Sequence, residues 1–440
     1  MSSAIALRQQ QQDRKSGHVN TLTNEQAEQL RMCWEAVFTL FETQNAPNAT
    51  DNPPNTSTKN GKKTNGQDSA QGTSVYNNLA RKLKPKQTSD NANNGGTDKY
   101  NESAEFLSAM KLYSPEEIRQ AFWSLSGADD PDVIVLRFLR ARKWDIEKAI
   151  AMLLSTLKWM LQTGVQEITK DGEEGLFKYF DEKGEKEGIM IQFTSGKSFI
   201  RGTDKEGRPV CYINVRFHKK EEQSFEVLQK FTIYIMETTR LMIKSPVETG
   251  CLVFNMEGFS LSNMDFPYVK YIIQCFEAYY PESLGVLIIH KAPWVFGGLW
   301  KLISPLLDPV VASKVRFTQN DKELLDLIPA ENLISDLGGE DQWKYCYVPP
   351  EENENYRMKD EVTKKQKIEY RLSLEPQFES LTKQWIKDPN NTKITNERDQ
   401  LKEQLRKAQL EVNPYVRART FYHRIGVLKE DGTCEWGNQK

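Results

Sequence analysis

The chain has 440 residues, of which 38% are hydrophobic and 27% are charged, and its formal net charge is −2. This length leaves room for two or three domains, and the near-neutral charge argues against a nucleic-acid binder that depends on overall basicity. No window reaches the roughly 20 apolar residues that span a bilayer. The apolar run from Ala4 to Leu7 is too short for a secretion signal, and the six cysteines are scattered, so we expect a reduced, cytoplasmic protein.

The first predicted element is an amphipathic helix between residues 21 and 43. Thr23 followed by Gln26 is a capping signature, and apolar residues then recur at helical spacing. From residue 44 to residue 100 the composition changes to Asn, Thr, Ser, Gly, Lys and Pro, with little to bury. A chain of this kind cannot offset its conformational entropy, so the sequence predicts a disordered linker there.

Helical spacing returns at 106–110 and 115–125, and it continues through 133–142 and 145–162. After residue 164 short β-rich runs alternate with helical segments, which is typical of an α/β fold with a mostly parallel sheet. The expected strands are 188–193, 209–215, 252–256, 285–290 and 315–318, and the expected helices are 225–243, 267–280 and 299–307. After residue 350 the chain is strongly charged, and we expect 397–410 to form a solvated surface helix.

Catalytic and metal-binding motifs are missing from the sequence. The triplet from Gly196 to Ser198 is reminiscent of a phosphate-binding loop, but that pattern requires glycine where Ile191 stands. The four histidines include no pair at metal-ligand spacing, and His290 at the end of an apolar run is interpreted as structural. We therefore predict a non-enzymatic protein without a metal or cofactor.

The segment from Ala292 to Leu307 is the most apolar stretch of the chain. Its apolar side chains cover nearly every side of a short helix, which indicates either burial in protein or contact with lipid. Gly297 and Gly298 would loosen one end and Pro305 would break or cap the other, so we expect a mobile gate. An ordinary core helix is the alternative. The predicted gate residues are Trp294, Phe296, Leu299, Trp300 and Ile303.

An ordered set of motifs carries a family resemblance. LRFLRARKWD at 136–145 is followed by DKEGRPV at 204–210, YYPESLG at 279–285 and LDPVVASKV at 307–315. Together they resemble the CRAL-TRIO lipid-transfer proteins, and most of all the yeast phosphatidylinositol-transfer branch. The resemblance implies a helical N-terminal lobe packed on an α/β lobe whose mostly parallel sheet floors a lipid cavity.

On this basis the sequence divides into five parts. They are an amphipathic helix (1–43), the linker (44–100), a helical lobe (101–165), a lipid-binding domain (166–348) and a charged helical extension (349–440).

The resemblance also implies which residues hold the lipid. When the motifs are matched one by one, the residues implied to bind the phosphatidylinositol head group are Arg142, Glu282 and Lys314. The two cations suit a phosphodiester, and the carboxylate suits the inositol hydroxyls. The protein is then expected to visit membrane surfaces transiently, with a lipid kinase as a possible partner.

The site that holds phosphatidylcholine in some relatives is altered here. Two tyrosines, a serine and a threonine are replaced by Ile200, Cys211, Gly250 and Leu252, which offer a quaternary ammonium no aromatic face and its phosphate no hydroxyl. We therefore expect choline-lipid exchange to be lost. Two alternatives stay open: a carrier of a sterol or squalene-like neutral lipid, and a lipid-dependent scaffold for a lipid kinase whose tail (351–440) provides a docking surface.

Overall fold

The computed structural model describes residues 17–42 and 98–437, and these form two compact units. The first unit contains the helices up to residue 162 together with residues 375–403, and the second contains residues 163–374 and 404–440. The predicted linker lies almost wholly outside the described residues. The chain after residue 349, expected as one extension, is shared between both units, and the domain boundaries drawn from the sequence stay predictions.

The first unit is helical. It holds α2 (Asn24–Glu42), α4 (Glu102–Leu112), α5 (Pro115–Ser126), α6 (Pro131–Ala141), α7 (Ile146–Thr163) and the adjoining parts of α15 (Glu361–Lys387) and α16 (Thr392–Val416). The predicted capping box of α2 is confirmed, because the Gln26 amide accepts the Thr23 N–H at 3.0 Å and the Thr23 hydroxyl accepts the Gln26 N–H at 3.2 Å. Trp34 is fully buried against Phe122 and Phe378, with ring centroids 5.6 and 5.8 Å away.

The helix predicted at 397–410 is confirmed, but the expectation that it is solvated was wrong for one of its faces. Leu401 and Leu405 of α16 are buried, and so is the guanidinium of Arg398. This guanidinium donates to both oxygens of Asp132 at 2.6 and 2.5 Å, and Lys402 lies 2.7 Å from the same carboxylate. The dense charges of α16 therefore include cations on a buried face, and these cations are neutralised within the first unit.

The second unit is an α/β structure with a five-stranded sheet in the order β1-β2-β3-β4-β5. The strands are β1 (Ser198–Thr203), β2 (Pro209–Asn214), β3 (Gly250–Asn255), β4 (Leu284–His290) and β5 (Val315–Thr318). Only β1 runs antiparallel to its neighbour, so the predicted mostly parallel sheet is confirmed. The helices of this unit are α8 (Val165–Glu182), α9 (Lys186–Thr194), α10 (Phe225–Met242), α11 (Phe266–Gln274), α12 (Phe296–Ile303), α13 (Pro309–Ser313), α14 (Asp321–Leu325) and α17 (Phe421–Arg424).

The strand predicted at 188–193 is instead the helix α9, and β1 was not predicted. Ile189 and Phe193 are both buried and stand four residues apart, so the alternation of apolar residues also fits one face of a helix. The sequence of β1 does not show an apolar run because Arg201 lies in its centre. That arginine is buried and forms an ion pair with Asp341 at 2.6 Å.

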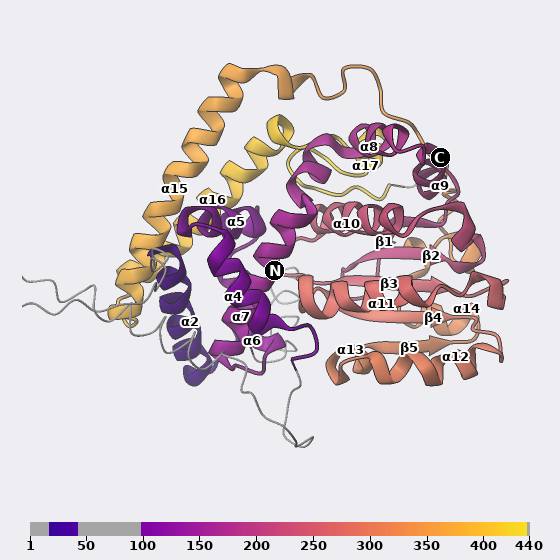
Figure 1. Cartoon of the computed structure of the whole chain (residues 1–440), viewed down its shortest axis with the longest axis horizontal. Helices are drawn as coiled ribbons and strands as arrows, with labels where there is room; N and C mark the ends of the chain where they lie inside the picture. The colour runs from indigo at the N-terminus through magenta and orange to yellow at the C-terminus, as the bar shows by residue number, and fades with distance from the viewer. Residues whose placement is uncertain (1–16, 43–97, 438–440) are drawn as a thin grey trace, which may run out of the picture. The chain divides into compact units, whose positions relative to one another are not determined.

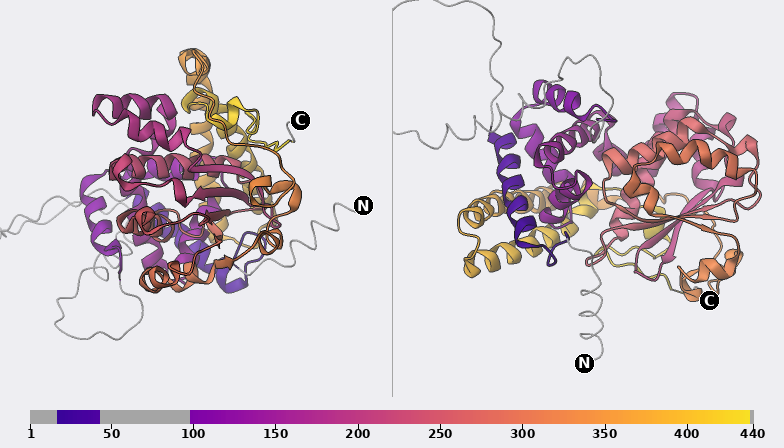
Figure 2. Two further views of the ribbon diagram at one scale, coloured as in Figure 1. Left: turned by 90° about the vertical axis from the view of Figure 1, so that its right-hand side faces the viewer. Right: turned by 90° about the horizontal axis from the view of Figure 1, so that it is seen from below.

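The two faces of the sheet pack against different parts of the chain. α10 and α11 lie over one face, and the segment from residue 324 to residue 345 covers the other (Figures 1 and 2). Val210, Val253 and Ile288 project onto the second face, where Leu324 and Leu333 close a fully buried core. The first face is not filled in this way, and the cavity described below lies there.

Candidate functional site

The candidate site is an apolar hollow between the sheet and the helices α10, α11 and α12. Its larger part has an empty volume of about 1070 Å³, and an adjoining part has about 770 Å³. The two parts share wall residues from β1, β2, α10 and α11: Ser198, Ile213, Phe231, Tyr268 and Ile272. Because the walls are shared, we treat the two parts as one cavity.

The residues predicted to replace the choline-lipid site come together on adjacent strands. Ile200 pairs with Cys211 across β1 and β2, and Cys211 pairs with Leu252 across β2 and β3. Paired residues project to the same face, so the three form one apolar row across the sheet. Cys211, Gly250 and Leu252 line the smaller part of the cavity, while Ile200 is fully buried and its N–H donates to the Tyr422 hydroxyl at 2.6 Å.

Glu282 stands on a turn with a constrained backbone. α11 continues as one π-helical turn from Cys275 to Tyr279, and the chain then reaches Glu282, whose φ is +54°. Such turns and positive φ values are frequent at functional sites. The preceding Tyr280 is buried and donates its hydroxyl to Glu237 at 3.0 Å, which anchors the turn. Ser283 and Leu284, which follow Glu282 directly, line the cavity.

Lys314 meets Glu282 beside the same edge of the sheet. Asp308 caps the short helix α13, and Lys314 is the residue that ends it, directly before β5. The Lys314 ammonium lies 3.2 Å from a Glu282 oxygen, and both side chains are about one-fifth exposed. The structure therefore brings together two of the three predicted head-group residues.

Arg142, the third predicted head-group residue, belongs to the helical unit. It is the residue that ends α6, and its guanidinium donates two hydrogen bonds to the Glu102 carboxylate. The side chains are 21% and 10% exposed, respectively. Arg142 thus has a structural partner of its own within that unit.

The predicted gate residues occupy α12 and its approach. Phe296, Trp300 and Ile303 line the larger part of the cavity, and Leu299 packs against the same apolar cluster. Trp294 instead points outward and is 92% exposed. Apart from the adjacent residues and the helix's own backbone, no heavy atom lies within 4 Å of where a Cβ would stand at Gly297 or Gly298, so this side of α12 is open.

A polar cluster at the end of the cavity near β1 escaped the sequence analysis. It contains Lys197, Gln192, Gln223, His218 and Asp265, of which all but Gln223 line the cavity. The Lys197 ammonium lies 3.0 Å from the Gln192 amide oxygen and 3.2 Å from that of Gln223. Burial lowers the pKa of Lys197 to about 8. The triplet around Lys197 was noticed in the sequence only as a failed nucleotide motif.

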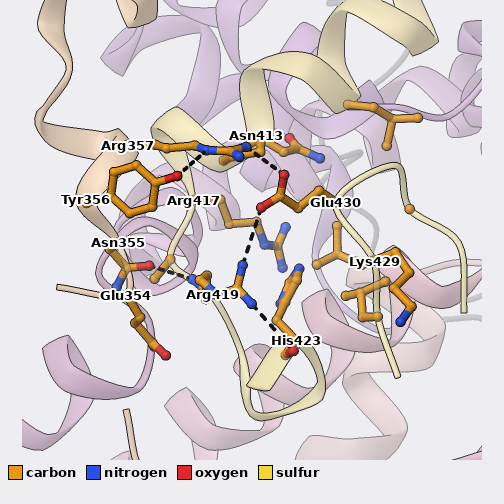
Figure 3. Close-up of a pocket in the computed structure, with 16 residues that line it drawn as sticks. Glu354, Asn355, Tyr356, Arg357, Asn413, Arg417, Arg419, His423, Lys429 and Glu430 are labelled. Carbon is orange, nitrogen blue, oxygen red and sulfur yellow. Dashed lines mark hydrogen bonds and ion pairs between the residues drawn. The ribbon is translucent and has the colours of Figure 1, made fainter. Parts of the chain in front are cut away.

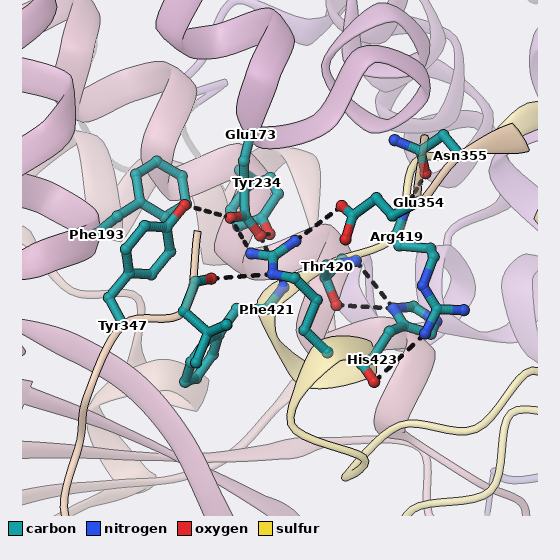
Figure 4. A network of polar contacts seen from close by, with 12 residues as sticks. Glu173, Phe193, Tyr234, Tyr347, Glu354, Asn355, Arg419, Thr420, Phe421 and His423 are labelled. Atoms are coloured by element: carbon teal, nitrogen blue, oxygen red, sulfur yellow. Dashed lines mark hydrogen bonds and ion pairs between the residues drawn. The ribbon is translucent and has the colours of Figure 1, made fainter. Parts of the chain in front are cut away.

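The C-terminal segment is attached to the α/β unit by a buried carboxylate, Glu173. This residue is 1% exposed and accepts hydrogen bonds from the hydroxyls of Tyr234 and Tyr347 at 2.6 and 2.5 Å and from the N–H of Phe421 at 2.7 Å (Figure 4). Arg424 completes the set with an ion pair to the same carboxylate. The end of the chain is therefore an integral part of this unit.

A second hollow, of about 640 Å³, lies where residues 354–357 meet the C-terminal segment. It is rich in arginine, but Glu430 takes up much of the charge. This carboxylate lies 2.6 Å from the Arg357 guanidinium and 3.4 Å from that of Arg419 (Figure 3). Because these charges are already paired, the hollow serves best as a junction between chain segments.

Within residues 17–42 and 98–437, no group of three or more potential metal ligands comes together. None of the helices in this part of the chain has the length and hydropathy of a transmembrane span. Cys211, Cys251 and Cys275 are free thiols and are buried.

Comparison with known proteins agrees with this arrangement. Residues 193–339 match the model of the CRAL/TRIO domain, and residues 102–155 match that of the CRAL/TRIO N-terminal domain. A CRAL-TRIO domain-containing protein of Schizosaccharomyces pombe, C3H8.02, is 40% identical over 72% of this chain and 70% of its own length. The phosphatidylinositol transfer protein CSR1 of Eremothecium gossypii is 38% identical over 74% of both chains. The SEC14 cytosolic factor of the same organism is 32% identical over 48% of this chain and 69% of its own. The chain therefore belongs to the CRAL-TRIO family of lipid-binding and lipid-transfer proteins.

Proposed function

We propose that the protein binds phosphatidylinositol and exchanges single lipid molecules between membranes through a gated cavity, without exchanging phosphatidylcholine. The observation that carries this proposal is the Glu282–Lys314 pair at 3.2 Å beside an apolar cavity. Lys314 offers N–H donors to a lipid phosphate, and Glu282 offers acceptors to inositol hydroxyls. A relative 38% identical to this chain is named a phosphatidylinositol transfer protein.

The cavity supplies the driving force for extraction. Water contact costs an acyl chain about 0.8 kcal/mol per CH₂, so two chains with about 30 such groups cost roughly 24 kcal/mol. Apolar walls around the chains remove most of this cost. A carrier working in this way needs no chemical step, which fits a non-enzymatic protein that acts in the cytoplasm and visits membranes transiently.

Selectivity against phosphatidylcholine follows from the apolar row Ile200–Cys211–Leu252. A choline head group placed there would lose its hydration and find no hydroxyl donor from these three residues. The same row favours a second candidate cargo, a sterol or squalene-like molecule without a charged head. Arg142 is proposed as a phosphate ligand on the family resemblance alone, and in that role it would exchange its bond to Glu102 for one to the lipid.

In this proposal α12 is the gate that opens the cavity. Its inner side chains, Phe296, Trp300 and Ile303, line the cavity, while the exposed Trp294 would meet the interface of a bilayer. Trp side chains are favoured at that interface. Membrane contact can therefore favour the open state by the difference in binding free energy between the two states.

The proposal is tested by transfer of labelled phosphatidylinositol and phosphatidylcholine between donor and acceptor vesicles. We expect Lys314→Glu and Glu282→Lys each to reduce phosphatidylinositol transfer about tenfold or more, since each loses a charge-assisted contact and adds a like charge. Lys322→Glu, a change of the same kind at an exposed position on α14, is the matched control. Transfer that is unchanged in both head-group variants, or efficient phosphatidylcholine transfer by the unmodified protein, would refute the assignment.

A further inference from the structure

The Glu282–Lys314 pair beside the cavity and the Lys197 cluster in its wall lie at opposite ends of the parallel strands. Glu282 precedes β4 and Lys314 precedes β5, so both stand where parallel strands begin. Lys197 precedes the antiparallel β1, whose first residue pairs with Ile213 near the end of β2. Strands of six residues rise about 3.3 Å per residue, which places the Lys197 end about 20 Å from the head-group end.

Lys197 is held rigidly at that far end. Its side chain is buried, with the residue 4% exposed, and two of its three N–H donors are directed at the amide oxygens of Gln192 and Gln223. Gln192 itself is anchored, because its amide N–H donates to the Gly188 carbonyl at 2.9 Å and to Gln223 at 3.0 Å. The ammonium therefore keeps one donor for a further partner.

The charge of Lys197 has no counter-ion in contact. Among the described residues, no carboxylate lies within ion-pair distance of its ammonium. Asp265 is nearby but already occupied, since it faces the His218 ring nitrogen Nε2 at 3.2 Å and accepts the Tyr268 N–H at 3.1 Å. The other ring nitrogen of His218, Nδ1, is buried without a hydrogen-bond partner. A buried charge in this condition is costly unless a ligand completes it.

We propose that the Lys197 end of the cavity binds the carboxylate of a long apolar chain. This inference rests on the proposed function in so far as the hollow is the lipid site. The methyl end of an ordinary acyl chain has nothing to offer the ammonium, whereas a carboxylate forms the strongest type of hydrogen bond available to it. An alcohol would accept a weaker bond, and an ester oxygen carries no charge to neutralise. Two molecules bring such an end: a free fatty acid entering carboxylate first, and a phospholipid whose chain ends in a carboxylate.

Binding of the carboxylate should depend on the protonation of Lys197. Glu222 and Asp265 act on Lys197 and favour its charged form. His218 is the third titratable group nearby, and its pKa is lowered first by burial and then by the charge of Lys197. Since the pKa of Lys197 without ligand is about 8, oleate affinity should fall as pH rises above 8.

The experiment measures binding of oleate, oleyl alcohol and methyl oleate, and of a phosphatidylinositol with one carboxylate-ended chain, by quenching of tryptophan fluorescence. Lys197→Met keeps the length of the side chain and removes the charge. Lys205→Met, at an exposed turn, is the matched control. We expect Lys197→Met to weaken oleate binding at least about tenfold and to abolish its fall above pH 8, with methyl oleate weak in every protein.

Each arm of the experiment has a defined meaning. If Lys197→Met weakens the binding of oleate, the site is assigned to free fatty acids. If it weakens only the binding of the carboxylate-ended phospholipid, the site is assigned to the ends of phospholipid chains. Equal binding of both ligands by the unmodified protein and Lys197→Met overturns the inference. Transfer of ordinary phosphatidylinositol by the unmodified protein is measured in parallel as the test of the proposed function. Loss of that transfer from the unmodified protein would refute the proposed function while leaving the result at Lys197 standing.

Discussion

Replacement of Arg424 by methionine should strongly destabilise the α/β unit. The Arg424 side chain is 2% exposed and forms ion pairs with Glu173 and with Glu354, whose side chains are 1% and 5% exposed. Methionine fills much of the same volume but leaves two buried carboxylates without their cation. Removing one partner of a buried ion pair costs about 3–5 kcal/mol. For a unit of this size that loss corresponds to a fall of roughly 10 °C in the unfolding midpoint.

Arg419→Met is the matched control for Arg424→Met. Arg419 belongs to the same segment and pairs with Glu430 at 3.4 Å, but the two side chains are 35% and 46% exposed (Figure 3). A pair exposed to this degree contributes about 0–1 kcal/mol. Thermal and urea unfolding, followed by circular dichroism, should therefore separate the two variants clearly.

A double variant tests the cause of the loss. Because Glu173→Gln removes one of the orphaned charges, Arg424→Met combined with Glu173→Gln should cost less than the two single changes added together. Hydrogen exchange should also quicken within residues 404–437 in Arg424→Met. If Arg424→Met were as stable as Arg419→Met, the view that this network attaches the C-terminal segment would be wrong.

Three further predictions concern other parts of the chain. Asp132→Asn should cost about 3 kcal/mol at pH 7 by urea unfolding. Burial acts to raise the pKa of Asp132, but Arg398 and Lys402 outweigh burial and lower that pKa. The contribution of the Asp132 carboxylate to stability is therefore present above about pH 4 and is lost as pH falls. An equal loss of stability in Asp132→Asn at pH 7 and at pH 3 would contradict this. For Lys197 stability also rises with pH, but at higher pH, because its pKa of about 8 lies below the unfolded value and the unfolded chain binds more protons between pH 8 and 10.5. Stability relative to Lys197→Met should therefore rise by about 3 kcal/mol across that range, and a flat difference would show that Lys197 is solvated. Trp294→Ala should leave the free energy of unfolding within about 0.5 kcal/mol, since this side chain is 92% exposed, yet reduce sedimentation with vesicles several-fold; unchanged sedimentation would exclude Trp294 from the membrane contact.

The sequence by itself determined most of the architecture. Helical spacing located α2 and the helices between residues 102 and 163, and the runs of successive apolar residues located β2 to β5 to within two residues at each end. These signals are local, because burial of one face leaves a period in the sequence and burial of both faces leaves a continuous apolar run. Glu282 and Lys314 were named from the family resemblance carried by YYPESLG and LDPVVASKV, and the structure brings the two side chains to 3.2 Å.

Tertiary structure decided the elements and sites whose stabilising partners are distant in sequence. β1 contains a buried arginine whose charge is neutralised by Asp341, 140 residues later. The face of α16 that was expected to be solvated is buried because its cations pair with Asp132. Glu173 attaches the C-terminal segment because four donors from three chain segments contact its carboxylate. Lys197 drew notice for the wrong motif, since a lone lysine in a sequence does not reveal that it will be buried without a counter-ion. A buried charge is acceptable or costly according to the groups that surround it in space, and no periodicity along the chain records those groups.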